Sequence, residues 1–453
     1  MTALTVEDTD MSYRTPVTDL SAARDVACVF PDVNAIPRGK IRPARDFKAG
    51  AELRIAEAIG LHTVDGNYPD DDITGDSDQD VRLVPDLRSL RLLPWRPSRA
   101  IAIHDAVHFD GRPSDFAARS VLLRVLEAFE ARGLHAVVAP EIEFYLFERN
   151  DRIEAGFEAP RGRGGVIEQS PAGYSLAAAD EHAAFWDELG VALEGLGVRT
   201  DTWLHEVGQS QYELNLLHGD PLDVADQVIY FKMALREVAA RHGLLAVFMA
   251  KPVAGQPGSS MHLHQSVVDA AGRNIFADPA SGADTEAFSA YIGGLQRYMP
   301  DFMLIFAPFI NSWRRYVHGS QAPVNLEWAE DNRTVALRVP SSGPVARRVE
   351  NRLAGSDANP YLAIAASLAC GLRGIEEGLA RRPSIGDRSG YTFPRELPLG
   401  IEAALLTLGA SVPAAEMLGA GFVRAYCGVK QTEFDAFMAE VGAWERRHLA
   451  LQV

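Results

Sequence analysis

The sequence predicts an α+β protein in which a small strand-rich unit precedes a larger mixed unit. Three observations support this prediction. Strand-like runs fill about the first 110 residues, helical spacing of apolar residues begins near Ser114, and helices and strands then alternate without the strict βαβ rhythm of a parallel fold. With 453 residues and 47% hydrophobic content, the chain is long enough for both units. We expect a loose tail over residues 1–20, the first unit over 21–112 and the second over 113–453.

The elements of the first unit follow from short apolar runs between turn signals. The run ARDVACVFPD predicts a strand, and NAIPRGK after it predicts a turn. Residues 64–80 are dense in glycine, proline and aspartate, so we expect an irregular loop there. VRLV from Val81 and the β-like run over residues 91–109 complete a strand-rich unit.

The second unit opens with an amphipathic helix. Its apolar residues follow Ser114 or Asp115, either of which would cap the helix, and Gly133 would end it. The later expected elements are a strand at HAVVAPEIEFYLFE, a Gly- and Arg-rich loop over 155–165, a helix near 180–196, two strand-like pieces within 198–217, a helix from Pro221 with Asp220 before it, a strand at LLAVFMAKP and mainly helices from Asn359 onward.

Composition excludes several classes of partner. The formal net charge of −17 argues against nucleic acid, because phosphate backbones are bound by an excess of lysine and arginine. The cysteines, Cys28, Cys370 and Cys427, lack the spacing of a disulfide framework or of a zinc site. The acidic first residues do not resemble a signal peptide, and no apolar run approaches the roughly 20 residues of a membrane helix. We therefore expect a soluble cytoplasmic protein with neither nucleic acid nor membrane as partner.

The stretch KPVAGQPGSSMHLHQS, residues 251–266, combines a glycine turn with a short strand that carries His262 and His264. Alternation along a strand points both imidazole rings to one face, and Met261 and Leu263 to the other. Glycine in the turn lets backbone approach a small ligand, since it has no side chain. Taken alone, two histidines at this spacing are also typical of polar residues at a sheet edge, so the neighbouring motifs must decide.

Carboxylates at alternating positions form a second pattern. Glu141 and Glu143 share one face of the strand PEIEFYLF. This pattern also describes an exposed face, but like charges so close repel each other unless a cation lies between them. Five carboxylates and one imidazole make an oxygen-rich set suited to Mg²⁺ or Mn²⁺ rather than to zinc. The six residues are Glu141, Glu143, Glu206, Glu213, Glu350 and His262.

Arginine is concentrated between residues 314 and 352, where seven arginines fall. Its planar fork suits carboxylates and phosphates, so this cluster in an acidic chain indicates an anionic ligand, such as the phosphates of a metal-bound nucleotide. No GxxxxGK[ST] loop occurs, so any ATP must be bound by another scaffold.

Six motifs, in this order along the chain, resemble successive motifs of the glutamine synthetase family. They are PEIEFYLF, LHEVGQSQYELN, FMAKPVAGQPGSSMHLHQS, NSWRRYVHGSQAPV, DNRTVALRVP and RRVENRLAGSDANPYLA. The amino-terminal RGK, together with VRLVPDLRSLRLLPW, resembles that family as well, and the resemblance covers about residues 30–450.

The resemblance implies a small amino-terminal β-grasp domain and a large catalytic domain with an antiparallel sheet flanked by helices. It also implies a homo-oligomer, a dodecamer of two stacked hexameric rings, in which the β-grasp domain of one subunit roofs the active site of the next. The implied activity makes γ-glutamyl phosphate from L-glutamate and ATP, and an amine then displaces the phosphate. Two or more Mg²⁺ or Mn²⁺ ions per active site would neutralise charge during phosphoryl transfer.

The family's site residues carry over by matching motif positions. Glu143, Glu206 and Glu213 match the ligands of one metal ion, and Glu141, His262 and Glu350 match those of the other. The positions that match glutamate contacts are Gly258, Arg315 and Arg352. Those that match nucleotide and phosphate contacts are His264, Ser266, Arg333, Arg338 and Arg348, and the catalytic candidates are Arg333, Arg352 and Asp65.

Two segments depart from glutamine synthetases proper, which carry a DGSS-like latch segment and a glutamate in a flap of the form GYEAPV. Here the latch reads DGNY from Asp65, and GSQAPV places Gln321 at the flap. An uncharged amide cannot act as a base or as a counter-ion for ammonium. Pro257 and Gly258 also replace an Asn-Gly pair of the family's glutamate loop. The chain thus resembles the glutamate–amine ligase branch of the family, whose known type is γ-glutamylputrescine synthetase.

The expected acceptor is an organic amine, either a polyamine or a monoamine. An alkylammonium has a pKa near that of lysine, about 10.4, so it must lose a proton before it attacks. Asp65 is the candidate base or cation anchor. The acidic loop could attract a polycationic amine, although it is also typical of an ordinary solvated loop. Its acidic residues are Asp70, Asp71, Asp72, Asp76 and Asp78.

Three other readings stay open at this point. A glutamine synthetase using ammonium is the alternative within the same reaction class. A catalytically silent family member would be expected to lose metal carboxylates, and none is lost here. A nucleotide- or metal-binding module without ligase chemistry gives no reason for the glutamate positions Arg315 and Arg352.

Overall fold

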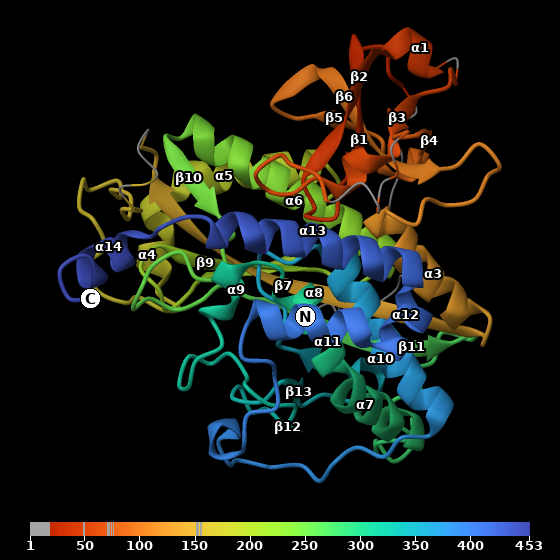
Figure 1. Cartoon of the computed structure of the whole chain (residues 1–453), viewed down its shortest axis with the longest axis vertical. Helices are drawn as coiled ribbons and strands as arrows, with labels where there is room; N and C mark the ends of the chain where they lie inside the picture. Colours follow the sequence, from red (N-terminus) through yellow and green to blue (C-terminus); the bar gives the residue numbers. More distant parts are fainter. Residues whose placement is uncertain are drawn as a thin grey trace, which may run out of the picture.

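Two mainly antiparallel sheets and a set of helices make up the described part of the chain (Figure 1). The computed structural model describes residues 19–48, 50–69, 73, 75, 77–150, 154 and 156–453. The expected tail therefore lies outside the described residues, except for Asp19 and Leu20. The predicted mixture of helices and antiparallel sheet is confirmed.

The amino-terminal sheet is built from residues 25–107, and its strands run in the order β2-β1-β6-β4-β3, with β5 on β6. In Figure 1 it stands above the rest of the chain, in red and orange. The predicted turn NAIPRGK is only partly a turn, because β2 already begins at Pro37. The elements are β1 (Asp25–Pro31), β2 (Pro37–Pro43), α1 (Ala44–Lys48), β3 (Arg54–Ala56), β4 (Asp80–Pro85), β5 (Arg91–Leu93) and β6 (Arg96–Val107).

The second sheet runs in the order β12-β13-β14-β11-β7-β9-β8, with β10 on β7. The long strand β7 lies between β9 and β11 and pairs antiparallel with both. Only β12 and β13 pair in parallel within this described sheet. The strands are β7 (Leu134–Glu148), β8 (Thr200–His205), β9 (Gln211–Leu216), β10 (Leu244–Val247), β11 (Met261–Asp269), β12 (Trp328–Glu330), β13 (Leu337–Val339) and β14 (Val349–Asn351).

The helices cover the second sheet and supply most of the core. The helix predicted from Pro221 is α6, and its residues Val224, Val228, Phe231 and Leu235 form a buried stripe at helical spacing. The helices are α3 (Ala118–Glu130), α4 (Leu176–Ala179), α5 (Ala183–Gly195), α6 (Pro221–Arg241), α7 (Glu286–Tyr298), α8 (Met303–Phe306), α9 (Ile310–Trp313), α10 (Pro360–Glu377), α11 (Ile401–Ala410), α12 (Val412–Leu418), α13 (Ala420–Met438) and α14 (Ala443–Leu449).

The predicted start of α3 is wrong. The helix begins at Ala118 after Ala117, which provides no side-chain cap. The Ser114 hydroxyl instead donates to Glu57 Oε1 and accepts from the backbone N–H of Phe116. The sequence could not show that a tertiary partner from the first sheet would take this hydroxyl.

No single helix among the described residues is long and apolar enough to cross a membrane. Helices α11 and α12 reach that length and composition only as a pair, with a bend of 74° between them.

A buried ion cluster joins the amino-terminal sheet to the helices of the second unit. Arg119 on α3 donates to Asp86 Oδ2 at 2.6 Å, to Asp226 Oδ1 at 3.1 Å and also to Asp105. The Tyr361 hydroxyl donates to the same Asp226 oxygen at 2.6 Å. Arg119 thus holds together three carboxylates from separate segments while its own side chain is 3% exposed.

Replacing Arg119 with alanine should destabilise the fold strongly. The change leaves three largely buried carboxylates without their shared cation, a loss worth about 3–5 kcal/mol when a buried ion pair is broken. Urea denaturation followed by circular dichroism measures the shift. The matched control is Arg112→Ala, whose exposed pair with Asp110 should contribute little. Equal midpoints for the two variants would contradict a structural role for the cluster.

Candidate active site

The pairing of β7 with β9 and β11 brings the predicted acidic residues together. Glu141 lies opposite His262 on one side and Asn215 on the other, and Glu143 lies opposite Glu213. Because side chains alternate along a strand, both β7 glutamates occupy one face of the sheet. The other face carries Ile142 and Phe144, which are fully buried in the core.

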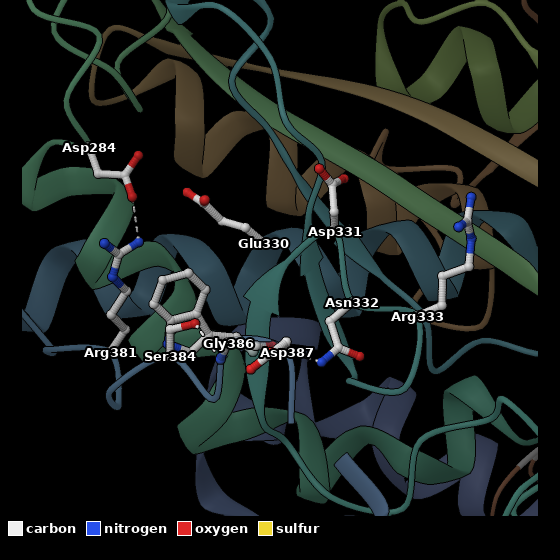
Figure 2. A pocket seen from close by; sticks show the side chains of 10 residues that line it. Asp284, Glu330, Asp331, Asn332, Arg333, Arg381, Ser384, Gly386 and Asp387 are labelled. Atoms are coloured by element: carbon white, nitrogen blue, oxygen red, sulfur yellow. Dashed lines mark hydrogen bonds and ion pairs between the residues drawn. The ribbon is translucent and has the colours of Figure 1, made fainter. Parts of the chain in front are cut away.

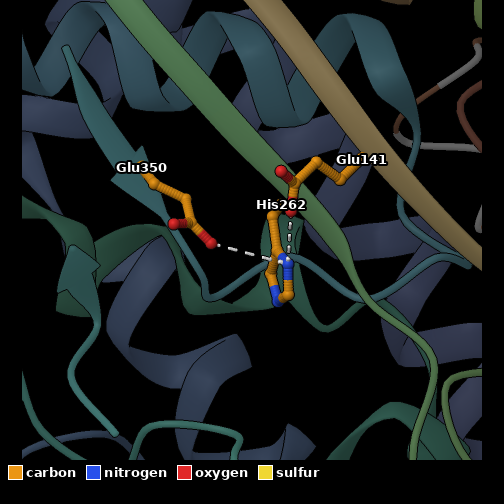
Figure 3. Close-up of side chains that lie close together, drawn as sticks. All are labelled: Glu141, His262 and Glu350. Carbon is orange, nitrogen blue, oxygen red and sulfur yellow. Dashed lines mark hydrogen bonds and ion pairs between the residues drawn. The ribbon is translucent and has the colours of Figure 1, made fainter. Parts of the chain in front are cut away.

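His262 lies between two carboxylates (Figure 3). Its Nδ1 is 3.3 Å from Glu141 Oε2 and 3.6 Å from Glu350 Oε1. One ligand atom of each of these residues lies within 4.8 Å of the others. Glu141 also accepts a hydrogen bond from His264 at 2.7 Å, so the two histidines do share a face of β11.

A second group with the same spacing consists of Glu143, Glu213 and His262. His262 therefore belongs to both groups, whereas the motif positions assign it to one. Glu206 lies just beyond the end of β8 and lines the same pocket as Glu143 and His262, but it belongs to neither group. Its carboxylate accepts a hydrogen bond from its own neighbour, the backbone N–H of Val207, at 2.9 Å.

The electrostatics of these groups favour a bound cation. Burial, reinforced by the charge of Glu206, raises the pKa of Glu143 to about 7. Burial and then the charge of Glu141 raise the pKa of Glu213 to about 9. Burial and the nearby Arg352 lower the pKa of His262 to about 4, which leaves a neutral ring able to act as a ligand.

The other two carboxylates are charged in spite of burial. Burial opposes ionisation of Glu141, but hydrogen bonds from His262 and His264 outweigh it and hold its pKa below the ordinary value. Glu350 is fully buried, yet the adjacent Arg352 guanidinium holds its pKa down at about 2. Oxygen donors of both kinds, together with a neutral imidazole, fit Mg²⁺ or Mn²⁺.

A pocket of about 330 Å³ lies beside the acidic cluster, and the predicted glutamate positions line it. Arg315 is 2% exposed and donates to the Ser260 hydroxyl at 2.8 Å and to the Leu353 carbonyl at 2.7 Å. Gly258 packs against it so closely that an added Cβ would lie 2.8 Å from the Arg315 side chain and 2.8 Å from the Ala250 carbonyl oxygen. Only glycine fits there.

Arg352 lines the same pocket and is 5% exposed. Its Nη1 donates to Glu350, but its buried Nε has no hydrogen-bond partner among the described residues. Buried donors in native proteins are nearly always satisfied, so this atom indicates an acceptor that the described chain does not supply. A carboxylate or phosphate is the acceptor that a guanidinium suits.

The predicted nucleotide positions divide into two sets. Arg338 donates to Glu350 Oε2 at 2.7 Å, and Arg348 Nε lies 3.1 Å from His264 Nδ1, so both arginines border the acidic cluster. Ser266, two residues along β11 from His264, is half-buried on the same strand face. Arg333 is separate from this set.

Arg333 is exposed and lies at one edge of a second cavity of about 730 Å³ (Figure 2). The ion pair of Asp284 with Arg381 lies at the opposite edge, at 2.8 Å, and the Arg381 guanidinium covers the Trp328 ring. The described structure records no hydrogen bond or ion pair of Arg333 with the acidic cluster.

Asp65 and Gln321 occupy different regions of the chain. Gln321 lines the pocket of Arg315 and Arg352 and has a positive φ of 61°. Asp65 does not line that pocket, and its carboxylate accepts hydrogen bonds from Thr63 and Asn67 in its own loop. Of the acidic residues expected in the same loop, Asp78 is exposed, and Asp70, Asp71, Asp72 and Asp76 lie outside the described residues.

Sequence reasoning missed two residues near the acidic cluster. Tyr174 has its pKa raised by burial and then by the charge of Glu206, and its φ is 63°. Lys251 lines the pocket of Arg315 and donates through Nζ to the Gln256 carbonyl. Tyr174 lies in the irregular run SPAGYSL, which has no periodicity to point at it. Lys251 opens the histidine stretch, where lysine's rarity in the chain was the available signal.

The fold and these groups define a class of protein, an α+β enzyme whose acidic cluster suits divalent metal ions and whose buried arginines suit an anionic substrate. The catalytic-domain model of the glutamine synthetase family, "Glutamine synthetase, catalytic domain", matches residues 115–449. The chain belongs to the glutamine synthetase family. The predicted resemblance is thereby confirmed.

Relatives of known activity include glutamate–amine ligases. Glutamate–isopropylamine ligase of a Pseudomonas species is 35% identical over 91% of this chain and 92% of its own. The γ-glutamylethanolamide synthetase GlnA4 of Streptomyces coelicolor is 33% identical over 94% and 93%. Glutamine synthetases match as well, among them that of Methanocaldococcus jannaschii at 33% identity.

A solved structure of GmaS without ligand has the same fold. It superposes with a TM-score of 0.82 at 29% identity and covers 94% of this chain and 97% of its own. The catalytic-domain fold implied by the motifs is thus confirmed, as is the resemblance to the branch that contains glutamate–amine ligases.

Binding of Mn²⁺ should release protons and strengthen as the pH rises. The metal-free chain holds protons on Glu143, with a pKa of about 7, and on Glu213, with a pKa of about 9, and a bound cation must displace them. The apparent affinity should therefore fall between pH 8 and pH 6, by up to about tenfold per pH unit for each proton released. Isothermal titration calorimetry in two buffers of different ionisation enthalpy counts these protons.

The Glu143→Ala variant provides the control for this measurement. It removes one of the two protonated carboxyls, so it should bind Mn²⁺ more weakly and release fewer protons. The stability of the metal-free fold changes with pH in the direction opposite to Mn²⁺ affinity. Both pKa values lie above the ordinary 4.5, so the stability these groups contribute below pH 4.5 is lost as the pH rises through about 7 and 9. Unchanged proton release in Glu143→Ala would exclude Glu143 as a ligand.

Proposed function

We propose that the chain is an ATP-dependent ligase that joins the γ-carboxyl of L-glutamate to the nitrogen of an organic amine through γ-glutamyl phosphate. One observation supports it above the others. An acidic cluster suited to divalent ions and a buried guanidinium with an unpaired donor, Arg352 Nε, meet around a single pocket beside His262. Sequence similarity to glutamate–isopropylamine ligase and γ-glutamylethanolamide synthetase supports the same reaction class.

Each part of the pocket has a proposed task. Gly258, Arg315 and Arg352 bind glutamate. Arg315 is held by Ser260 and by the Leu353 carbonyl, so its position is fixed before substrate arrives. Arg352 Nε remains free to donate to the substrate carboxylate. Donors that are already in position need no reorganisation during the reaction, which lowers its activation free energy.

Two or more Mg²⁺ or Mn²⁺ ions per site would stabilise the negative charge that develops during in-line phosphoryl transfer. Glu143, Glu206 and Glu213 are the proposed ligands of one ion, and Glu141, His262 and Glu350 those of the other. His264, Ser266, Arg333, Arg338 and Arg348 are the proposed nucleotide contacts, with Arg333 and Arg352 as catalytic residues.

The reaction balances in two steps. A glutamate γ-carboxylate oxygen attacks the γ-phosphorus of ATP, and ADP leaves. The alkylammonium loses one proton to solvent, and its nitrogen attacks the γ-carbonyl carbon. Inorganic phosphate leaves as the amide bond forms, and the second proton of the nitrogen passes to that phosphate. Hydrogen bonds from Thr63 and Asn67 lower the pKa of Asp65, which makes it a weak base. We therefore assign Asp65 the role of cation anchor rather than that of base.

The assembly and location follow as parts of the same proposal. Asp65 does not line the pocket of its own chain, and we propose that it contributes to the pocket of a neighbouring subunit. We propose the dodecamer of two hexameric rings, with residues 21–112 as a β-grasp domain that covers the next catalytic domain, residues 113–453, and a cytoplasmic enzyme whose partners are ATP, L-glutamate and the amine.

A panel of acceptors tests the choice of second substrate. Phosphate release with glutamate, ATP and Mg²⁺ should be faster with at least one organic amine than with ammonium, because the neutral Gln321 offers ammonium no counter-charge. The panel contains ammonium, ethanolamine, isopropylamine, putrescine, spermidine and an aromatic amine. If ammonium is the best acceptor, the enzyme is a glutamine synthetase.

Replacing Gln321 with glutamate should move the preference toward ammonium. The added carboxylate supplies a counter-charge beside the pocket, and about 1.4 kcal/mol of extra transition-state stabilisation corresponds to a tenfold rise in rate. We expect kcat/KM for ammonium relative to the best organic amine to rise by about tenfold or more. Gln321→Asn is the matched control, because asparagine is neutral and tolerates the φ of 61°. The same preference in both variants would show that this position does not select the acceptor.

A further inference from the structure

A third cavity, separate from the pocket of Arg315 and partly open to solvent, lies against the connection between β8 and β9. It measures about 440 Å³ and is bounded by residues 160–170, by α4 and by the start of β9. Ser210 and Tyr212 line this cavity, whereas Gln211 between them lines the active-site pocket. Alternation along the strand thus places the cavity and the active site on opposite faces of one short segment.

Two shielded oxygens in the cavity are candidate acceptors. Glu168 Oε1 has no hydrogen-bond partner among the described residues, and Ser210 Oγ has the neighbouring Tyr212 hydroxyl beside it. Ser210 is 2% exposed and has a φ of 54°, an uncommon conformation for serine. The other carboxylate oxygen of Glu168 accepts from the backbone N–H of Ser210 at 2.7 Å and lies 3.1 Å from His205 Nε2. Unsatisfied buried oxygens of this kind require a donor.

The residues that line the cavity indicate the chemical class of ligand that would carry the donor. Among the described residues no lysine or arginine lines the cavity, and burial lowers the pKa of His182, so that ring is neutral and offers a further acceptor. Glu181 already lies 4.0 Å from the Arg163 guanidinium. The remaining walls are largely apolar, with Pro160, Val166, Ile167 and Ala178. An anion is excluded by Glu168, and a short alkyl chain that ends in a protonated amine fits both the oxygens and the walls.

Residues 205–211 separate the cavity from the active site and make hydrogen bonds on both sides. His205 Nδ1 lies 2.7 Å from the Glu206 carbonyl, and Glu206 is a proposed metal ligand. Gln211 accepts from the backbone N–H of Gly208 at 3.0 Å and donates to the Gly258 carbonyl at 2.9 Å. A ligand that satisfies Ser210 and Glu168 therefore fixes the same residues that position Glu206 and Gly258.

We propose that this cavity is a regulatory site for a small primary alkylammonium ion, and that its occupation strengthens divalent-metal binding at the active site. The proposed ligand is of the same chemical class as the acceptor amine, and in this respect the inference rests on the proposed function. Linkage makes the effect reciprocal, so Mn²⁺ should strengthen amine binding by the same factor as amine strengthens Mn²⁺ binding.

Equilibrium binding to the full-length protein tests the proposal without turnover. The probe is n-butylammonium chloride, titrated by calorimetry with and without Mn²⁺ and in the absence of ATP and glutamate. We expect the Mn²⁺ dissociation constant to fall by about fivefold or more when the amine is present. Ala178→Phe fills the cavity and should abolish this shift, whereas Ala177→Phe, at an exposed neighbour that does not line the cavity, should retain it.

The outcomes separate this proposal from the proposed function. Amine binding that is equal in Ala178→Phe and in the parent, or no effect of the amine on Mn²⁺ affinity, would overturn it. If Ala178→Phe does not fold, Ser210→Ala, which deletes only the hydroxyl, should weaken amine binding by about fivefold, consistent with one hydrogen bond. Loss of ligase activity toward every amine with the coupling intact would instead overturn the proposed function alone.

Discussion

Repulsion between buried carboxylates is the constraint on which the active site depends. Strand pairing sets Glu143 directly opposite Glu213, and both side chains are 8% exposed. The register cannot slip to relieve them. A shift by one residue would turn Ile142 and Phe144 toward the polar face and bury the glutamates in the core. The core therefore holds the acidic residues together, and the charge between them has to be met by protons or by cations.

Arginine side chains next to the acidic cluster compensate part of its negative charge. Glu350 is fully buried between Arg352, Arg338 and His262, so it connects the acidic cluster to the basic one. This arrangement keeps Glu350 ionised, while the pKa values of Glu143 and Glu213 are raised in the metal-free chain. A site that carries both signs of charge in one small volume suits substrates whose charge moves during the reaction, as it does in phosphoryl transfer.

Periodicity in the sequence was enough to predict the elements that carry the site. Alternation along PEIEFYLF predicted that Glu141 and Glu143 would share one strand face, and alternation along MHLH predicted the same for His262 and His264, because each apolar neighbour needs the core. Pro221 after Asp220 predicted the start of α6 for the same local reason, a side-chain cap that needs no distant partner. Where the determining contact was local, the prediction succeeded.

Features set by distant contacts could not be predicted in this way. The start of α3 moved because the Ser114 hydroxyl bonds Glu57, which lies 57 residues earlier in the chain. His262 belongs to both groups of ligands because β11 lies against β7 and close to β14 at once, which no single motif encodes. The shielded Ser210 and Glu168 oxygens were missed because serine and glutamate are common in loops. Only the cavity in the folded chain distinguishes these two residues.

The flap and the latch loop are the two segments that bear on the proposed preference for an organic amine over ammonium. Gln321 at the rim of the pocket carries no charge, and the pKa of Asp65 is lowered within its own loop. That loop is held to α13 of its own chain, since the backbone N–H of Val64 donates to Glu433 at 2.9 Å and Lys430 donates to the same carboxylate. A charge that is fixed in this way can complete a neighbouring pocket only through the assembly of subunits. Under the proposed function, selection of the amine would then depend on the contact between two chains as well as on the residues within one.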